Sequence, residues 1–300
     1  MTKKARPHNG CEHPANLLSL THIPMRIIKS NGKQVVFQPE KIMQTLKRIG
    51  AKDELIAHVV QKVTADIKDG MTTKEVYATI RKELHKENKC IAHRYNLRSG
   101  LLRLGPAGFK FEKYVASILK AYEYEAEVPK DDLVGLCVRH EIDIVAKTKS
   151  RTIMIEAKFR NRFDDTVTLK DAMSTWARLI DLREGSKVNP KTPFFHEGWI
   201  VTNGRFSESA HQFGTCKGMK LIGWNEPAES LARMVDHAAL YPITVMEHMK
   251  DWEMERLSKK NIMLCREMAT KRPAALSEST GIPLARVQSL IDTCKEIVAG

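Results

Sequence analysis

Three polar residues near the ends of two predicted strands have the types and spacing of a metal-dependent hydrolytic site. Asp143 interrupts an apolar run, and Glu156 and Lys158 follow it two residues apart. Two carboxylates about 4 Å apart repel by roughly 4 kcal/mol at an effective dielectric constant near 20, so the pair favours a divalent cation between them. Oxygen ligands favour Mg²⁺ or Mn²⁺ over Zn²⁺. Such a metal can activate water and neutralise a phosphate under attack, with Lys158 orienting the water or stabilising the negative charge.

An ordinary surface salt bridge is the alternative for this motif. A lone Glu-x-Lys in a strand is usually an exposed edge pair that contributes little. Asp143 favours the chemical interpretation, because it lies between Ile142 and Ile144, where an unpaired charge would be costly.

The elements that must position these residues are two strands, at residues 139–146 and 151–158, joined by a polar turn. The two-residue period of a strand places Glu156 and Lys158 on one face and Ile153 and Ile155 on the other. The same period predicts that Asp143 faces away from both Ile142 and Ile144. The pairing register decides whether the polar faces converge.

This pattern resembles the PD-(D/E)XK nuclease superfamily, and within it the Mrr-like restriction endonucleases. The likeness covers roughly residues 106–250 and continues in Trp199–Asn203, Phe206-Ser207 and Leu221–Trp224. It implies an α/β/α core of restriction-endonuclease type. Its motifs here are Gly108-x-x-Phe111-Glu112, Asp143 and Glu156-Ala157-Lys158.

The resemblance implies roles for four residues. Asp143 and Glu156 would bind the metal, Lys158 would be catalytic, and Glu112 would complete the site, although an ordinary surface glutamate remains an equal alternative. The family often has a glutamine beside its lysine, where this chain offers only Asn161.

The charge distribution places the strongest positive field in the first third of the chain. Residues 1–105 account for +11 of the net charge of +13. The nuclease-like part must therefore hold DNA through local clusters rather than bulk charge. Arg160 and Arg162 follow the motif directly and are the predicted phosphate contacts.

The segment from Met25 to Gly105 predicts a hairpin with an Asn-Gly turn followed by helices at residues 39–49, 54–68, 73–86 and 91–104. It resembles the ATP-cone domain, which senses ATP or dATP without hydrolysing it. A small α+β domain with solubilising lysines is the alternative, and Ser30 stands where cones commonly have arginine. The residues that this resemblance implicates in nucleotide binding are Lys29, Asn31, Gly32, Phe37, Lys41 and Thr73.

The remaining pattern predicts a multidomain α/β and α+β protein. Residues 169–183 predict a helix, and residues 198–224 predict a β-α-β unit with a parallel pair. Near the end, Gly281-Ile282-Pro283 joins two helices into a helical hairpin. This hairpin resembles a helix-hairpin-helix that binds DNA phosphates, while a plain helical pair that closes the core or mediates homo-oligomerisation is the alternative. The predicted domains are a flexible arm at 1–24, an ATP cone at 25–105, a nuclease at 106–250 and a helical segment at 251–300.

Composition narrows the function classes. The chain has no apolar run of membrane-spanning length and no CxxC pair, which argues against a membrane protein and against a zinc ribbon. We therefore expect a cytoplasmic protein with DNA and an adenine nucleotide as partners and Mg²⁺ or Mn²⁺ as cofactor. The predicted function is a DNA endonuclease of restriction or antiviral defence that responds to ATP or dATP. A repair or junction nuclease and a non-catalytic nucleotide-sensing DNA binder are the alternatives.

Overall fold

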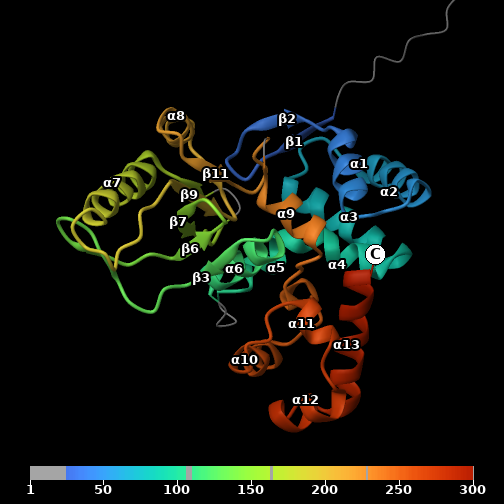
Figure 1. The fold of residues 1–300 in the computed structure, drawn as a ribbon. Helices are drawn as coiled ribbons and strands as arrows, with labels where there is room; N and C mark the ends of the chain where they lie inside the picture. The colour runs from blue at the N-terminus through green and yellow to red at the C-terminus, as the bar shows by residue number, and fades with distance from the viewer. Residues whose placement is uncertain (1–24, 106–109, 163–164, 228, 300) are drawn as a thin grey trace, which may run out of the picture.

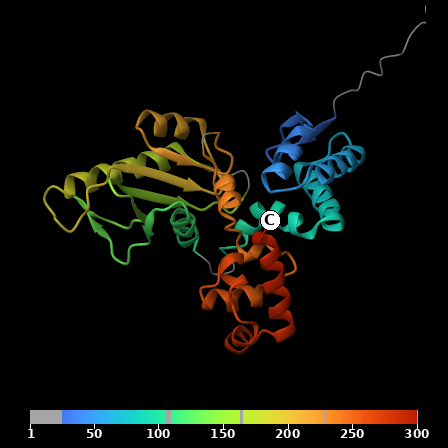
Figure 2. The same cartoon turned by 45° about the vertical axis from the view of Figure 1, so that its right-hand side comes forward.

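The computed structural model describes residues 25–105, 110–162, 165–227 and 229–299 (Figure 1). The predicted arm at 1–24 and Gly108 of the nuclease pattern lie outside the described residues. The described chain forms three parts: a blue-to-teal N-terminal part, a green-to-orange part built on a sheet, and a red helical part (Figures 1 and 2). Residues 89–102 lie where these parts meet.

The N-terminal part is a two-stranded antiparallel hairpin packed on helices. Its elements are β1 (Arg26–Ile28), β2 (Gln34–Val36), α1 (Pro39–Arg48), α2 (Asp53–Asp66), α3 (Thr73–Glu87), α4 (Lys89–Tyr95) and α5 (Leu97–Leu102). Apolar side chains at helical spacing, among them Ile42, Leu46 and Leu84, form its core. Thr72 caps α3 with a capping box to Glu75, so the helix begins where the sequence predicts.

One predicted helix is wrong: residues 91–104 are not continuous. The chain leaves helical geometry at Asn96, which separates α4 from α5. The Asn96 side chain donates to the Val245 carbonyl oxygen at 2.9 Å, a contact 149 residues away in sequence. The helical period of a sequence cannot reveal a helix break at a residue whose side chain bonds to so distant a position.

The central part is a mixed five-stranded sheet with strand order β11-β9-β7-β6-β3. The β7-β9 and β9-β11 pairs are parallel, and β6 is antiparallel to both of its neighbours. Its strands are β3 (Glu125–Glu127), β6 (Ile144–Lys147), β7 (Thr152–Lys158), β9 (Glu197–Thr202) and β11 (Lys220–Ile222). Short pairs flank the sheet: β4 (Leu133–Val134) with β5 (Arg139–His140), and β8 (Thr166–Val167) with β10 (Arg205–Phe206).

Helices cover both faces of this sheet, as expected for an α/β/α core (Figure 1). Alternate residues of β7 divide between the layers, so Ile153 and Ile155 join the core under α6, whereas Met154 joins the cluster under α7. The covering helices are α6 (Phe111–Ala121) and α9 (Leu231–Ala238) on one side and α7 (Leu169–Gly185) and α8 (Glu208–Cys216) on the other. The β9-α8-β11 segment is the predicted β-α-β unit with a parallel pair.

The predicted strand at 139–146 is interrupted. Residues 141–143 separate β5 from β6, and Asp143 lies at a bend. Ile142 consequently packs in the α7 layer, and Ile144 packs in the α6 layer. The prediction that both isoleucines lie opposite Asp143 is therefore wrong, because the strand period does not continue through the bend.

The red part contains the short helix η1 (Ile243–Val245) followed by α10 (Asp251–Lys259), α11 (Cys265–Ala269), α12 (Pro273–Thr280) and α13 (Leu284–Ala299). Gly281 takes a positive φ of 66° and ends α12, so the predicted helical hairpin is present. The buried face of α13, including Val287, Leu290 and Ile291, joins the same core as α6. This favours the core-closing alternative for the hairpin.

Candidate functional site

Asp143 faces the end of β7 from the bend before β6. The Ala157 N–H donates to its Oδ2 at 2.7 Å. Burial raises the pKa of Asp143 to about 6, and the Glu156 carboxylate adds to the rise, while the Ala157 hydrogen bond and Lys158 oppose it. Asp143 therefore contacts the backbone of β7 between Glu156 and Lys158.

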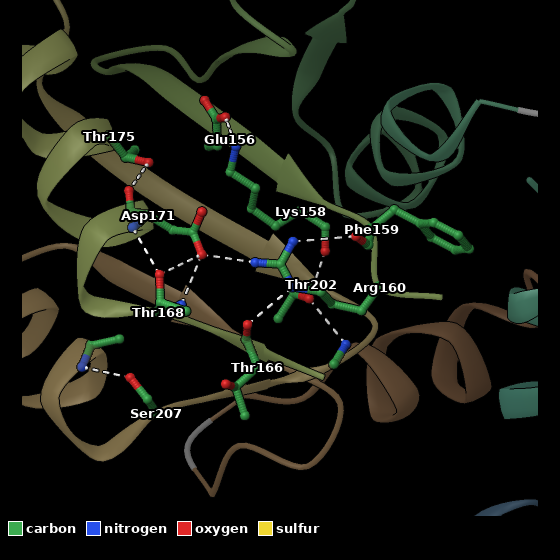
Figure 3. A network of polar contacts seen from close by, with 12 residues as sticks. Glu156, Lys158, Phe159, Arg160, Thr166, Thr168, Asp171, Thr175, Thr202 and Ser207 are labelled. Carbon is green, nitrogen blue, oxygen red and sulfur yellow. Dashed lines mark hydrogen bonds and ion pairs between the residues drawn. The ribbon is translucent and has the colours of Figure 1, made fainter. Parts of the chain in front are cut away.

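Glu156 is held by cations on both carboxylate oxygens. It is 5% exposed in the centre of the sheet. Lys158 Nζ lies 2.5 Å from its Oε1, and Figure 3 shows the two side chains pairing over β7. Arg178 of α7 pairs with Oε2. A carboxylate this buried is tolerated because it is paired.

Glu112 begins the first turn of α6 and lines a pocket beside Asp143. The pocket has a volume of about 250 Å³. Glu112 also raises the pKa of Asp143, which places the two carboxylates near each other. The charged lining residues are Glu112, Asp131, Asp132, Glu141 and Asp143, against Lys110 and Lys130. This excess of carboxylates favours a cation.

The donor chemistry of this set suits Mg²⁺ or Mn²⁺, but the three carboxylates are not preassembled: among the described residues, the ligand atoms that lie within 4.8 Å of one another are those of His58, Glu83 and Glu87. Asp143, Glu156 and Glu112 offer carboxylate oxygens, which these hard cations prefer. Asp143 already accepts one hydrogen bond on Oδ2 and is destabilised as an anion by burial and by Glu156. A bound divalent cation would remove that penalty.

The two arginines predicted to contact DNA are placed differently. Arg160 pairs with Asp171 at the start of α7, 2.8 Å away, so its guanidinium would have to leave this partner to reach a phosphate (Figure 3). Arg162 is exposed on the loop that follows β7. Asn161, considered as a substitute for the family glutamine, is also exposed.

Asn203 fixes the backbone beside the site. It is 6% exposed at the carboxyl end of β9. Its Oδ1 accepts from the Arg160 N–H at 2.7 Å, and its Nδ2 donates to the Arg160 carbonyl at 2.8 Å. These two hydrogen bonds fix the backbone of Arg160, two residues after Lys158.

The predicted nucleotide residues do not gather at one end of the β1-β2 hairpin: Phe37, whose N–H donates to the Met25 carbonyl, lies at the end opposite the Asn31-Gly32 turn. Gly32 adopts a φ of +78° in the turn, and its N–H donates to the Lys29 carbonyl at 2.8 Å. Asn31 Oδ1 accepts from the Lys33 N–H, so this side chain stabilises the turn. The bridge between Ile28 and Thr72 brings the end of β1 to the start of α3.

That bridge brings Lys29 and Thr73 to the same end of the hairpin, because each directly follows a bridged residue. Lys41 is exposed in the first turn of α1. Phe37, at 8% exposure, packs in the core of this part. The structure thus gives Phe37 a packing role whatever else it contacts.

Sequence reasoning missed two partners. Arg178 reads in the sequence as a surface arginine of a predicted helix, but α7 lies over β7 and points it at Glu156. Arg48 pairs with Asp236 at 2.8 Å across the two parts of the chain. The only sequence signal for either is a charged residue near the apolar face of a helix.

Comparison with known proteins agrees with this architecture. An uncharacterized protein of Archaeoglobus fulgidus is 32% identical over 165 residues, which cover 55% of this chain and 88% of the relative. The chain belongs to the family of this Archaeoglobus protein. The crystal structure of a protein of unknown function, AF1548, has a TM-score of 0.51 and 28% identity, and the match covers 68% of this chain and 99% of that one.

Three protein-family models match three successive segments of the chain. The ATP cone domain matches residues 25–99, the restriction endonuclease domain matches residues 106–231, and the AF1548-like C-terminal domain matches residues 241–298. The chain therefore carries an ATP cone followed by a restriction endonuclease-like domain, as the motifs predict. In the part of the chain that the structure describes, no helix is both long and apolar enough to cross a membrane.

Proposed function

We propose that this protein is a divalent-metal-dependent DNA endonuclease whose activity responds to ATP or dATP bound by the cone. The observation that supports the proposal is that Asp143, which lines a pocket rich in carboxylates, accepts from the backbone N–H between Glu156 and Lys158, and that these two residues pair with each other. The match to a restriction endonuclease domain supports it. Restriction or antiviral defence is the role that this pairing of domains favours.

The residues divide the work of phosphodiester hydrolysis. Asp143, Glu156 and Glu112 would hold Mg²⁺ or Mn²⁺, which supplies charge neutralisation at the phosphate and a more acidic water. The Lys158 ammonium lies where it can orient the attacking water or stabilise the phosphate as negative charge grows. Ala157 N–H fixes one oxygen of Asp143. Arg162 would contact the DNA backbone.

Plasmid cleavage tests the enzyme proposal. Wild-type protein with Mg²⁺ should nick or linearise supercoiled plasmid, whereas Asp143→Asn and Lys158→Met should lose at least about 100-fold in rate, because each removes a group used in the chemical step. Glu125→Gln, an exposed carboxylate on the edge strand β3, is the matched control and should cut normally. Equal nicking by wild type and both site variants would remove the proposal.

Calorimetry tests the nucleotide proposal. ATP or dATP should bind the wild type, and Lys29→Ala or Lys41→Ala should weaken binding by about tenfold, because each removes one cation from the phosphates. Lys62→Ala, on the exposed face of α2, should bind normally. Absence of heat with both nucleotides would end the sensor proposal.

One observation favours a non-catalytic nucleotide-sensing DNA binder as the second candidate. Both oxygens of Glu156 are occupied by cations, an arrangement that would also suit a purely structural carboxylate. The same plasmid assay separates the candidates, since this rival predicts DNA binding without cleavage in any divalent metal.

A further inference from the structure

The C-terminal domain presents a surface lined with backbone carbonyls to the last helices of the cone. Asn96 donates to Val245 O, and Arg103 donates to the Thr244, Met246 and Met249 carbonyls at 3.2, 3.3 and 2.9 Å. In return, Thr244 Oγ1 donates to the Gly100 carbonyl at 2.7 Å. Asn96 and Thr244 are 1% and 0% exposed, so the hydrogen bonds that these two side chains donate are interior ones.

The two backbones also approach closely at Gly100. A Cβ at this position would lie 2.9 Å from a Val245 side-chain carbon and 3.0 Å from its Cα. Leu97 and Leu101, on either side, join the core that contains Ile243. Close backbone packing at a glycine, buried leucines and buried hydrogen bonds together hold α5 in one specific position against the C-terminal domain.

The hairpin of this domain is poorly suited to bind phosphates. The Gly281 N–H donates to Ser277 O, the Ile282 N–H donates to Thr280 Oγ1, and Pro283 has no N–H. Arg256 covers the turn by donating to the Thr280 and Gly281 carbonyls. The first three residues of the turn therefore leave no backbone amide for DNA.

Helix α1 of the cone carries a proposed nucleotide ligand near its start and a contact with α9 at its end. Its first turn carries Lys41, a proposed nucleotide ligand, and its last residue, Arg48, pairs with Asp236 of α9. These positions are about 10 Å apart along the helix. Asp236 is 3% exposed at its side chain and accepts a hydrogen bond from Tyr241 at 3.0 Å.

Arg94 joins the end of α1 to the last helix. Its guanidinium donates to the Ile49 carbonyl at 3.1 Å and to the Ile297 carbonyl at 2.9 and 2.7 Å, and it lies over the Tyr241 ring. The end of α1, helix α9 and helix α13 therefore share one buried polar junction. A displacement of α1 would strain the hydrogen bonds of this junction.

Helix α9 in turn contacts the helix that carries Glu112. Tyr122 at the end of α6 donates to the Met234 carbonyl at 3.2 Å, and Tyr114 of α6 donates to Leu240 O at 2.9 Å. Glu112 lies in the first turn of the same helix, beside Asp143. These contacts lead from the end of α1 through α9 to the helix that carries Glu112.

We propose that the C-terminal domain, with α9, is the docking platform for the cone of its own chain, and that the Arg48–Asp236 pair relays the nucleotide state of the cone to the nuclease site. This assignment rests on the proposed function and specifies how the cone regulates that site.

Hydrogen exchange of the full-length protein tests the relay. In wild type, saturating ATP or dATP should change the exchange rate of amides in residues 231–238 by at least about threefold, while Arg48→Met and Asp236→Asn should reduce that response to less than about 1.5-fold. Lys47→Met, the exposed neighbour on α1, should respond as wild type does. An unchanged response in Arg48→Met would overturn the relay.

The same protein samples distinguish failure of the relay proposal from failure of the proposed function. Wild type that gives no heat with either nucleotide removes the sensor and the relay together. Wild type that binds nucleotide but does not cut DNA removes the nuclease only, and the exchange response still decides the relay. Where cleavage occurs, the ratio of rates with and without nucleotide should approach one in Arg48→Met and remain at the wild-type value in Lys47→Met.

DNA binding tests the platform against the phosphate-binding alternative. Lys271→Glu and Arg272→Glu, on the exposed start of the hairpin, should change DNA affinity by less than about twofold each, because the platform faces the cone. A tenfold loss in either variant would show that the hairpin grips DNA and would overturn the platform assignment.

Discussion

Arg178 of α7 and Glu156 of β7 form an ion pair across two layers of the nuclease-like fold. Lys158 occupies the other oxygen of the same carboxylate, so a metal ion at Glu156 must compete with two resident cations. This relationship links the position of α7 to the metal affinity of the site.

Arg178→Met should therefore increase metal affinity while weakening the fold. Without Arg178, the metal ion no longer competes with this cation for the Glu156 carboxylate, which favours metal binding by about 1 kcal/mol. Calorimetry without DNA should therefore show roughly fivefold tighter Mn²⁺ binding. The melting temperature should fall, because Glu156 loses a partner. Arg183→Met is the control on the same helix, since Arg183 binds backbone carbonyls rather than a carboxylate. Unchanged Mn²⁺ affinity in Arg178→Met would contradict the competition.

Metal binding should depend on pH through Asp143. Burial and the Glu156 carboxylate raise its pKa to about 6, so the metal-free protein is protonated there below that pH. Mn²⁺ must displace this proton, and its affinity should fall about tenfold for each pH unit below 6 and level off above about 7. The raised pKa also means that ionisation of Asp143 disfavours the metal-free fold as the pH rises from about 4 to 6. A flat affinity profile from pH 5 to 7 in wild type would refute this assignment.

Asp181 should stabilise the fold against unfolding at acid pH. The Cys137 N–H, followed by the His140 side chain, lowers the pKa of Asp181 to about 2, which outweighs its partial burial. A depressed carboxylate pKa stabilises the fold above the unfolded value near 3.9, and this stabilisation is lost as the pH falls toward 2. Asp181→Asn should therefore unfold at a higher pH than wild type during acid titration followed by circular dichroism. Coincident acid transitions would argue against this role.

Arg162 should contribute to DNA affinity without setting sequence preference. Arg162→Gln should weaken duplex binding about fivefold and reduce the slope of log affinity against log salt by about one, as loss of one phosphate contact requires. Lys149→Gln, at the opposite end of the β6-β7 hairpin, is the control of equal charge change. Titrations by fluorescence anisotropy at several salt concentrations measure both quantities, and equal slopes for the two variants would rule out the contact.

Gly100→Ala should destabilise the protein despite the higher helix propensity of alanine. The propensity gain is about 1 kcal/mol, whereas forcing Val245 away from a 2.9 Å contact costs about 1–3 kcal/mol. Urea unfolding should show a net loss of about 1 kcal/mol. Ser289→Ala on the exposed face of α13 should change stability by less than about 0.5 kcal/mol. A Gly100→Ala protein more stable than wild type would show that the two backbones can separate.

The features that follow local rules could be predicted from the sequence. The alternation at Ile153 and Ile155, the helical face of Phe111 and Val115, and the β9-α8-β11 unit all repeat at short spacing. The motif at Asp143, Glu156 and Lys158 could likewise be found, because a charge inside an apolar run is conspicuous. Their roles in catalysis stay predictions.

The features that depend on distant partners could not be predicted. The bend at Asp143 and the break at Asn96 accompany hydrogen bonds with Ala157 and Val245, which lie elsewhere in the chain. The pairing of Arg178 with Glu156 requires α7 to lie over β7, which no periodicity specifies. Local patterns fix the elements, whereas tertiary packing selects which charged residues meet.

The burial of Asn96 at the junction of the domains constrains how such proteins can be recombined in evolution. A cone grafted from another protein would have to supply an amide for Val245 O and a guanidinium for Ile297 O, or strand those acceptors in the interior. A grafted cone whose last two helices lack these donors should therefore dock less stably on the receiving surface.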